Sequence, residues 1–217
     1  MEIIKMKDIA VFGAGGFGRE VLTIIKAINK VGVKYNILGF FDDGEPIGKI
    51  INGYPVLGGV DALQKWTEDI CVVIAIGGPA VKRKIVEKIS NNNIEFPTLI
   101  HPHAIIGDDE LVDIGKGCII CAGTIITVNV RIEDFVILNL GCTVGHDTHI
   151  GEYASFMPSV NISGEVNIGK GVYVGTGAKI INRLTIGNDT VVGAGAVVVK
   201  ALPVNCTAVG VPAKIIK

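Results

Sequence analysis

The sequence lacks any long hydrophobic run. Although 49% of its 217 residues are hydrophobic and its mean hydropathy is +0.52, uncharged stretches such as residues 71–81 are interrupted by glycine or proline. A membrane-spanning helix needs about 18 apolar residues in a row, so none is expected. The first residues carry no signal-peptide cleavage pattern and lead directly into a predicted strand. We therefore expect a cytoplasmic protein with no membrane partner.

The sequence also lacks an excess of charge of either sign. Lys and Arg together number 20 and Asp and Glu 21, so the formal net charge is −1, and there is no basic run. Such a balance does not favour binding to nucleic acid or to anionic lipid. The expected partner is a small neutral or anionic molecule, and no nucleic acid is expected.

Cysteine and histidine are scarce. The five cysteines are scattered and odd in number, so we expect reduced thiols. Cys118 and Cys121 form a C-x-x-C pair, but the sequence has no second pair that would complete a zinc site. Small residues in a packed repeat are the simpler interpretation of these cysteines, and no metal is expected.

What the sequence does contain is a repeat of six residues. Fifteen consecutive sixth positions, the anchors, are large and apolar: Ile114, Ile120, Ile126, Ile132, Leu138, Val144, Ile150, Phe156, Ile162, Ile168, Val174, Ile180, Ile186, Val192 and Val198. The fourth position after each anchor is small or apolar. Glycine often follows the anchor directly, where we expect a sharp turn that needs freedom in φ: Gly115, Gly145, Gly151, Gly169, Gly175, Gly187 and Gly193. A period of six fits neither an α-helix nor simple strand alternation, and it predicts a hexapeptide β-helix.

The first hundred residues follow a different pattern. Strands and helices alternate there, at residues 9–12, 19–30, 37–41, 71–76 and about 79–90. This alternation predicts a parallel sheet covered by helices on both faces. We expect a small Rossmann-like α/β domain over residues 1–100 and a β-helix domain with a C-terminal cap over residues 106–217.

A glycine-rich turn joins the first predicted strand to the first helix. Gly13, Gly15 and Gly18 form a G-x-G-x-x-G pattern in the context that suits phosphate binding, because bare backbone lets a phosphate approach the helix N–H groups. One mononucleotide-binding half precedes the repeat, which favours a nucleotide or nucleotide-sugar over NAD. A purely structural turn is the alternative. Asp42 and Asp43 either accept hydrogen bonds from the ligand or form a solvated turn.

The repeat also carries a candidate for chemistry. His146 stands two positions after its anchor, so its side chain should point away from the packed interior. Gly164, one 18-residue coil later, should stack beside it and leave a gap with an exposed backbone N–H. A histidine base next to such a donor suits acyl transfer. Asp147 would orient the imidazole if the chain bends between the two residues. A solvent-facing histidine without a role is the alternative.

The end of the chain, residues 208–214 (AVGVPAK), resembles the closing segment of acetyl-CoA-dependent hexapeptide transferases. In matching order, the "FFDD" and "AIGG" turns, the "GHD" motif and the "GVPAK" ending resemble the bacterial sugar acetyltransferases that include sialic acid O-acetyltransferase and UDP-4-amino-sugar N-acetyltransferases. This resemblance covers nearly the whole chain. It implies a left-handed parallel β-helix, a homotrimer, and acetyl-CoA bound between the β-helices of adjacent subunits.

The resemblance also implies roles for single residues. His146 would be the catalytic base beside Asp147, and Asn139 would help to place the acceptor. A nucleotide-sugar would be met by Gly15, Gly16, Asp42, Asp43 and Gly77, with Lys82 at a phosphate. The CoA groove would be lined by Gly164, Thr176 and Ala194, with Lys214 at the CoA phosphates.

Two positions depart from the family's pattern. Many members have histidine where Phe17 stands, close to the sugar-binding site, and where Ser155 stands, close to the thioester. The first departure bears on the identity of the sugar acceptor, and the second bears on CoA contacts.

The resulting hypothesis is N-acetylation of a nucleotide-linked amino sugar in bacterial glycan biosynthesis, with direct attack on the thioester. The alternatives are O-acetylation of a sugar such as sialic acid and a β-helical binding module without activity. A zinc hydratase of the γ-carbonic anhydrase type would need three histidine ligands, and the repeat offers two. A sugar nucleotidyltransferase would need a basic glycine-rich loop that the N-terminal sequence lacks.

Overall fold

The structure is a computed structural model that describes residues 6–32, 34–107 and 110–217. Residues 1–5 of the expected N-terminal domain and residues 108–109 of the expected β-helix lie outside this range. Among the described residues, no helix combines the length and apolarity needed to cross a membrane.

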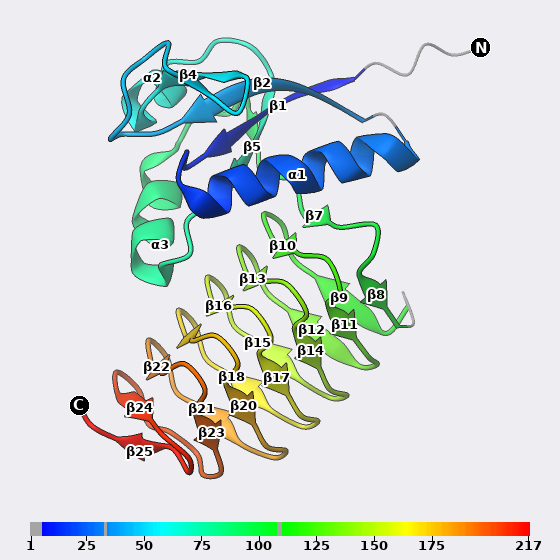
Figure 1. Cartoon of the computed structure of the whole chain (residues 1–217), viewed down its shortest axis with the longest axis vertical. Coiled ribbons are helices and arrows are strands. Elements are labelled where there is room, and N and C mark those ends of the chain that lie inside the picture. Colours follow the sequence, from blue (N-terminus) through cyan, green and yellow to red (C-terminus); the bar gives the residue numbers. More distant parts are fainter. Residues whose placement is uncertain (1–5, 33, 108–109) are drawn as a thin grey trace. The chain divides into compact units, whose positions relative to one another are not determined.

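The chain forms two compact units (Figure 1). The first unit runs to Gly77 and resumes from Val81 to Pro102, whereas the second contains Gly78–Ala80 and His103–Lys217. The α/β sheet of the first unit and the stacked parallel strands of the second confirm the predicted fold class.

The first unit is built on one six-stranded sheet with the order β3-β4-β2-β1-β5-β6, in which only the β3–β4 pair is antiparallel. Its strands are β1 (Lys7–Phe12), β2 (Tyr35–Phe41), β3 (Ile50–Ile51), β4 (Tyr54–Gly58), β5 (Ile70–Ile74) and β6 (Ile94–Glu95), and β7 (Leu99–Ile100) follows. Phe12 pairs with Phe41 on one side and Ile74 on the other, so β1, β2 and β5 end at the same edge. In such a sheet, ligands bind at this edge.

The described residues form three helices beside this sheet: α1 (Gly16–Val31), α2 (Val60–Gln64) and α3 (Pro79–Lys88). Helix α1 runs along the sheet in Figure 1 and buries an apolar stripe that includes Val21, Leu22 and Ile25. It begins three residues earlier than predicted, within the glycine-rich segment. The predicted strand over residues 71–76 ends at Ile74, because the chain leaves the sheet after the Ala75 amide bonds to Phe12.

In the second unit most strands pair in parallel with the strand 18 residues later, so three faces form. At the two ends the offset differs, because Ile105 pairs with Ile125 and Val191 pairs with Thr207. One face contains β10 (Ile119–Ile120), β13 (Ile137–Leu138), β16 (Ser155–Phe156), β19 (Tyr173–Val174), β22 (Val191–Val192) and β24 (Thr207–Val209), and β25 (Lys214–Ile215) closes it antiparallel. The second contains β8 (Ile105–Ile106), β11 (Ile125–Ile126), β14 (Thr143–Val144), β17 (Asn161–Ile162), β20 (Lys179–Ile180) and β23 (Val197–Val198). The third contains β9 (Val112–Ile114), β12 (Val130–Ile132), β15 (His149–Ile150), β18 (Asn167–Ile168) and β21 (Thr185–Ile186).

The anchors of the hexad form the interior of this β-helix. All of them are buried except Ile114, which is half-buried in the first coil. The threonines at the fourth position after the anchor are also buried, and each donates a hydrogen bond to a carbonyl oxygen of the next coil. Thr124 Oγ1 donates to the Asn139 carbonyl (3.2 Å) and Thr148 Oγ1 to the Ser163 carbonyl (3.3 Å). Buried hydrogen bonds of this kind let threonine replace valine or alanine inside the coil.

The prediction that the glycine directly after the anchor provides the freedom in φ is wrong. The left-handed residue is the third after the anchor, and φ is positive at all such positions from 117 to 195, including Asp147 at 56° and Phe135 at 57°. Glycine directly after the anchor serves another purpose, because there the coils lie too close for a side chain. A Cβ on Gly145, for example, would stand 2.6 Å from the Gly164 amide nitrogen.

Candidate functional site

His146 and Asp147 lie in the corner between β14 and β15, the second and third positions after the anchor Val144. His146 Nδ1 is 2.7 Å from Asp147 Oδ2. Neighbouring side chains on a flat strand point apart, but the left-handed φ of Asp147 turns the backbone and brings both side chains to the same side. The structure thus contains the bend that an imidazole–carboxylate contact requires.

The contact fixes the proton arrangement of the histidine. When Nδ1 donates to the carboxylate, Nε2 of a neutral imidazole carries the lone pair. Nε2 lies against Gly164. The hydrogen bond from His146, followed by one from Asn129, holds the pKa of Asp147 below its usual range, so the carboxylate stays ionised. Both side chains are about half exposed, at 56% for His146 and 50% for Asp147. An exposed base with a fixed tautomer can accept a proton from a ligand.

The second histidine of the repeat, His149, is differently placed. His149 Nε2 is 2.9 Å from Glu133 Oε1, and its Nδ1 is 3.1 Å from Asn167 Oδ1. Both ring nitrogens are therefore engaged within the chain. Of these two histidines, the geometry favours His146 as the reactive one.

Gly164 stacks beside His146, as the 18-residue period predicts. A Cβ at Gly164 would overlap the imidazole atoms Nε2, Cε1 and Cδ2, so only glycine leaves room for this ring. The glycine itself is buried, because the ring occupies the gap that was expected to be open. Its carbonyl accepts from the Arg183 amide (3.1 Å), whereas among the described residues its own N–H has no acceptor. An unused amide donor thus lies beside the base.

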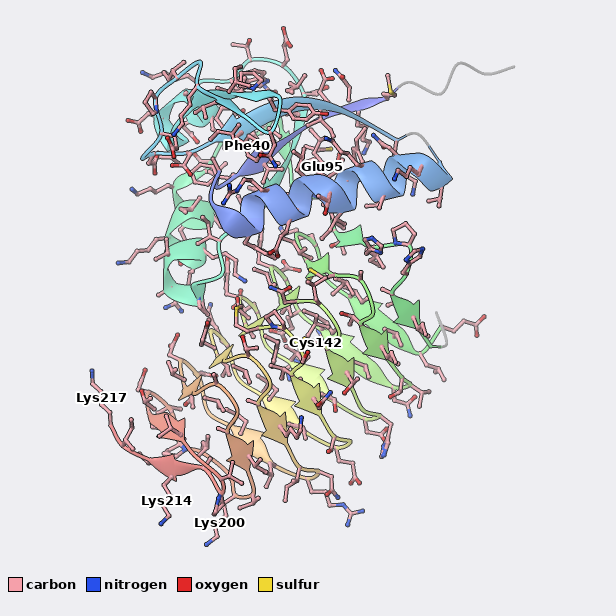
Figure 2. The ribbon with its side chains drawn as sticks, viewed as in Figure 1. Phe40, Glu95, Cys142, Lys200, Lys214 and Lys217 are labelled. Carbon is pink, nitrogen blue, oxygen red and sulfur yellow. The ribbon has the colours of Figure 1, made fainter. Side chains whose placement is uncertain are left out.

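The other residues predicted at the CoA groove lie elsewhere on the β-helix. Thr176 and Ala194 are both exposed and occupy the same position of successive corners, between β19 and β20 and between β22 and β23. Lys214 is exposed in β25 and lies at the C-terminal end of the chain, as Figure 2 shows. Ser155 is fully buried in β16. Within one chain, Thr176 and Ala194 therefore occupy a different corner of the coil from His146.

Asn139 also stands at a corner of the β-helix. It is 6% exposed, and its Oδ1 accepts a hydrogen bond from the Leu140 amide at 2.7 Å. This bond fixes the side-chain amide in one orientation.

The four glycines of the turn in the first unit differ in how much space surrounds them. Gly13 and Gly18 are required by packing, because a Cβ on Gly18 would overlap the Gly13 carbonyl and a Cβ on Gly13 would crowd Ile76. Gly15 and Gly16 are exposed, and a Cβ would meet no atom within 4 Å at Gly15 and only an arginine tip at 4.0 Å at Gly16. The open space over these two leaves room for a ligand at the N-terminus of α1, whose first turn has no acidic residue.

The two acids after β2 hold this region together. Asp42 Oδ2 accepts from the Ala14 amide and its Oδ1 from the Gly44 amide, both at 2.8 Å. Asp43 Oδ1 accepts from the Val60 amide (2.7 Å) at the start of α2. Both residues therefore shape the edge of the sheet, and each retains lone pairs that a ligand can use.

The remaining predicted residues also belong to this unit. Phe17, in the first turn of α1, and Gly77, after β5, are half-buried. Lys82, in α3, is 1% exposed, so its reach to a phosphate stays a prediction.

The sequence interpretation missed one partner of the candidate pair. Asn129 Nδ2 donates to Asp147 Oδ1 at 3.0 Å. Asn129 stands 18 residues before Asp147, so the coil period could have found it.

Comparisons with known proteins add the following. Residues 8–89 match the PglD N-terminal domain. The chain is 33% identical over 170 residues to the GDP-perosamine N-acetyltransferase of Escherichia coli O157:H7, covering 78% of this chain and 76% of that protein. It is 34% identical over 117 residues to the UDP-N-acetylbacillosamine N-acetyltransferase of Bacillus subtilis (strain 168), covering 54% and 52%. The crystal structure of PerB from Caulobacter crescentus, in complex with CoA and GDP-perosamine, matches with a TM-score of 0.87 and 30% identity over 98% of this chain and 99% of that one.

The pair of Glu133 and His149 predicts a pH-dependent contribution to stability. Burial acts to raise the pKa of Glu133, but hydrogen bonds from His149 and the Glu152 amide, with the charges of His149 and Arg131, lower it overall. A lowered folded pKa gives stability that is present above the ordinary glutamate pKa and is lost as the pH falls. Glu133→Gln should therefore lower the urea midpoint more at about pH 6.5 than at about pH 3.5. Equal losses at both pH values would contradict this assignment.

Proposed function

Since the chain belongs to the hexapeptide-repeat family of sugar acetyltransferases, we propose that it transfers the acetyl group of acetyl-CoA to the amine of a nucleotide-linked amino sugar. The fold is the one this family uses, an α/β unit followed by a left-handed parallel β-helix. The observation that carries the proposal is the His146–Asp147 pair packed against Gly164. The reaction would form an amide and release the CoA thiol.

The nucleotide part of the substrate is proposed to bind at the glycine turn of the first unit. Gly15 and Gly16 leave open space there, and the N-terminus of α1 supplies N–H groups that suit a phosphate. Gly77 and the carboxylates of Asp42 and Asp43 stand at the same edge of the sheet. The two curated relatives are named for GDP- and UDP-linked substrates, which supports a nucleotide-sugar without fixing the base.

Three further residues are proposed to contact the nucleotide-sugar. Phe17 follows Gly16 and would bear on which sugar fits. Lys82 would reach a phosphate, and Asn139 would help to place the amine.

The base of the proposed reaction is His146. Its Nε2 takes a proton from the amine as the nitrogen attacks the thioester carbonyl, and the C–S bond then breaks. The protonated imidazole returns a proton to the departing sulfur, so the histidine ends neutral. Asp147 stabilises the imidazolium that forms between these steps and keeps Nδ1 as the donor.

The N–H of Gly164 is proposed as the donor for the oxyanion of the tetrahedral intermediate. It has no acceptor among the described residues and stands beside the imidazole. Loss of one such donor typically costs about 100- to 1,000-fold in rate. Glycine is required at position 164 for a separate, steric reason, because a Cβ there would overlap the imidazole of His146.

The CoA groove is proposed to lie between subunits of a homotrimer. Thr176 and Ala194 occupy a different corner of the coil from His146, so one chain does not line a groove with both sets of residues. Lys214 is proposed to meet a CoA phosphate, and Ser155 to support the groove from its buried position. PerB, crystallised with CoA, supports acetyl-CoA as the acyl donor.

The acceptor class can be tested by thiol release from acetyl-CoA. We expect turnover with one UDP-, GDP- or dTDP-linked amino sugar, because the first unit offers a phosphate site and His146 a base for an amine. The matched control is the same amino sugar without its nucleotide, which should react far more slowly. Turnover only with a free sugar such as sialic acid would contradict both the acceptor and the nucleotide site.

The role of the base can be tested by His146→Ala. The rate of acetyl transfer should fall by about 100-fold or more, as for a lost general base, while CoA still binds. Asp147→Asn should lower the rate less, because the imidazole remains but loses its charged partner. The control is His149→Ala, which removes a histidine whose ring nitrogens are both engaged within the chain. An unchanged rate in His146→Ala would remove this residue from the mechanism.

A further inference from the structure

We propose that Asn129 is a positioning residue for this reaction, which holds the carboxylate of Asp147 in the orientation that aligns His146. The inference rests on the proposed function, because it concerns the same base. It assigns a role to a residue that lies one full coil away from the GHD motif.

Three side chains form a single chain of hydrogen bonds on this corner. Asn129 Nδ2 donates to Asp147 Oδ1 at 3.0 Å, and Asp147 Oδ2 lies 2.7 Å from His146 Nδ1. Each carboxylate oxygen therefore has its own partner, one on either side. With both oxygens engaged, rotation of the carboxylate about its last torsion would break two bonds rather than one.

The backbone places Asn129 and Asp147 side by side on neighbouring coils. Asn129 and Asp147 both have left-handed φ values, 54° and 56°, at the same position of successive coils. The Asp147 amide also donates to the Val128 carbonyl at 3.1 Å, which keeps the two corners in register. The amide and the carboxylate are thus stacked by the fold, so little side-chain entropy is lost when they pair.

Asp147 lies near other charged side chains, and Asn129 gives it a hydrogen-bond donor that carries no charge. One coil further along the same corner stands Glu165, which would repel Asp147, but Arg183 Nε donates to Glu165 Oε1 at 3.0 Å and offsets its charge. On the other side, Asn129 lines a surface hollow with Glu110, Asp113 and Arg131. Asn129 stabilises the ionised form of Asp147 without adding a charge, and it contributes to the lowered pKa of that carboxyl.

Backbone conformation alone does not explain asparagine at this position. Asparagine tolerates a left-handed φ better than most residues. Yet the equivalent positions of other corners hold phenylalanine, tyrosine, serine, glutamate and arginine in the same conformation, as at Phe135, Tyr153 and Ser159. The corner accepts many side chains, so the aim of the Asn129 amide at Asp147 is a separate feature.

Two substitutions separate positioning from backbone effects. Asn129→Gly keeps the left-handed turn and removes the side-chain amide, and kcat should fall roughly 10-fold with KM unchanged, as when a hydrogen-bond partner that orients a reacting group is lost. Asn129→Asp keeps the size of the side chain and the left-handed turn but places a carboxylate against that of Asp147. Its kcat should therefore fall further than that of Asn129→Gly. Asn205→Gly is the matched control, because Asn205 has a φ of 55° in the last coil and no contact with the pair; its kcat should equal that of the wild type.

A double-mutant cycle gives the decisive readout. In an Asp147→Asn background, Asn129→Gly should have almost no further effect on kcat, because the carboxylate that it positions is gone. A wild-type kcat in Asn129→Gly and Asn129→Asp, or full additivity with Asp147→Asn, would overturn the inference. If His146→Ala also retains its rate, the assignment of His146 as the base fails, and if His146→Ala is inactive, only the positioning role of Asn129 fails. A wild type that turns over no nucleotide-linked amino sugar would contradict the proposed function itself.

Discussion

The left-handed residue at the third position after the anchors from Ile114 to Val192 is the constraint on which this β-helix depends. It turns the chain through every corner from residue 117 to residue 195, so the anchors reach the interior and successive coils repeat after 18 residues. At one corner the same turn brings His146 and Asp147 to a common side. The catalytic pair that we propose is therefore a local use of the geometry that builds the whole domain.

Much of the fold follows from the sequence, because a period of six is visible without any structure. The predicted role of the glycines directly after the anchors was wrong. They provide space between coils, and φ is positive two positions later. The β3–β4 hairpin and α2 were missed because elements of two to five residues are too short to show periodicity. The strand predicted to end at residue 76 ends at Ile74, a boundary set by hydrogen bonding with β1 rather than by local composition.

The candidate site was predictable where it depends on spacing and not where it depends on packing. The 18-residue period places Gly164 beside His146, and the structure shows this contact. The sequence does not reveal that the ring fills the gap, nor that Ser155 and Lys82 are buried, because burial depends on residues distant in the chain. The division of the glycine turn into two glycines required by the protein and two left open also needed coordinates.

The central claim is that an imidazole at position 146 acts as the base, and chemical rescue tests it most directly. His146→Gly leaves a space where the ring stood, beside Gly164 and the Asp147 carboxylate. Imidazole added to this variant should restore acetyl transfer in proportion to its concentration, while the wild type and Asn205→Gly show no such gain. A variant that binds acetyl-CoA normally and gains nothing from imidazole would contradict the account.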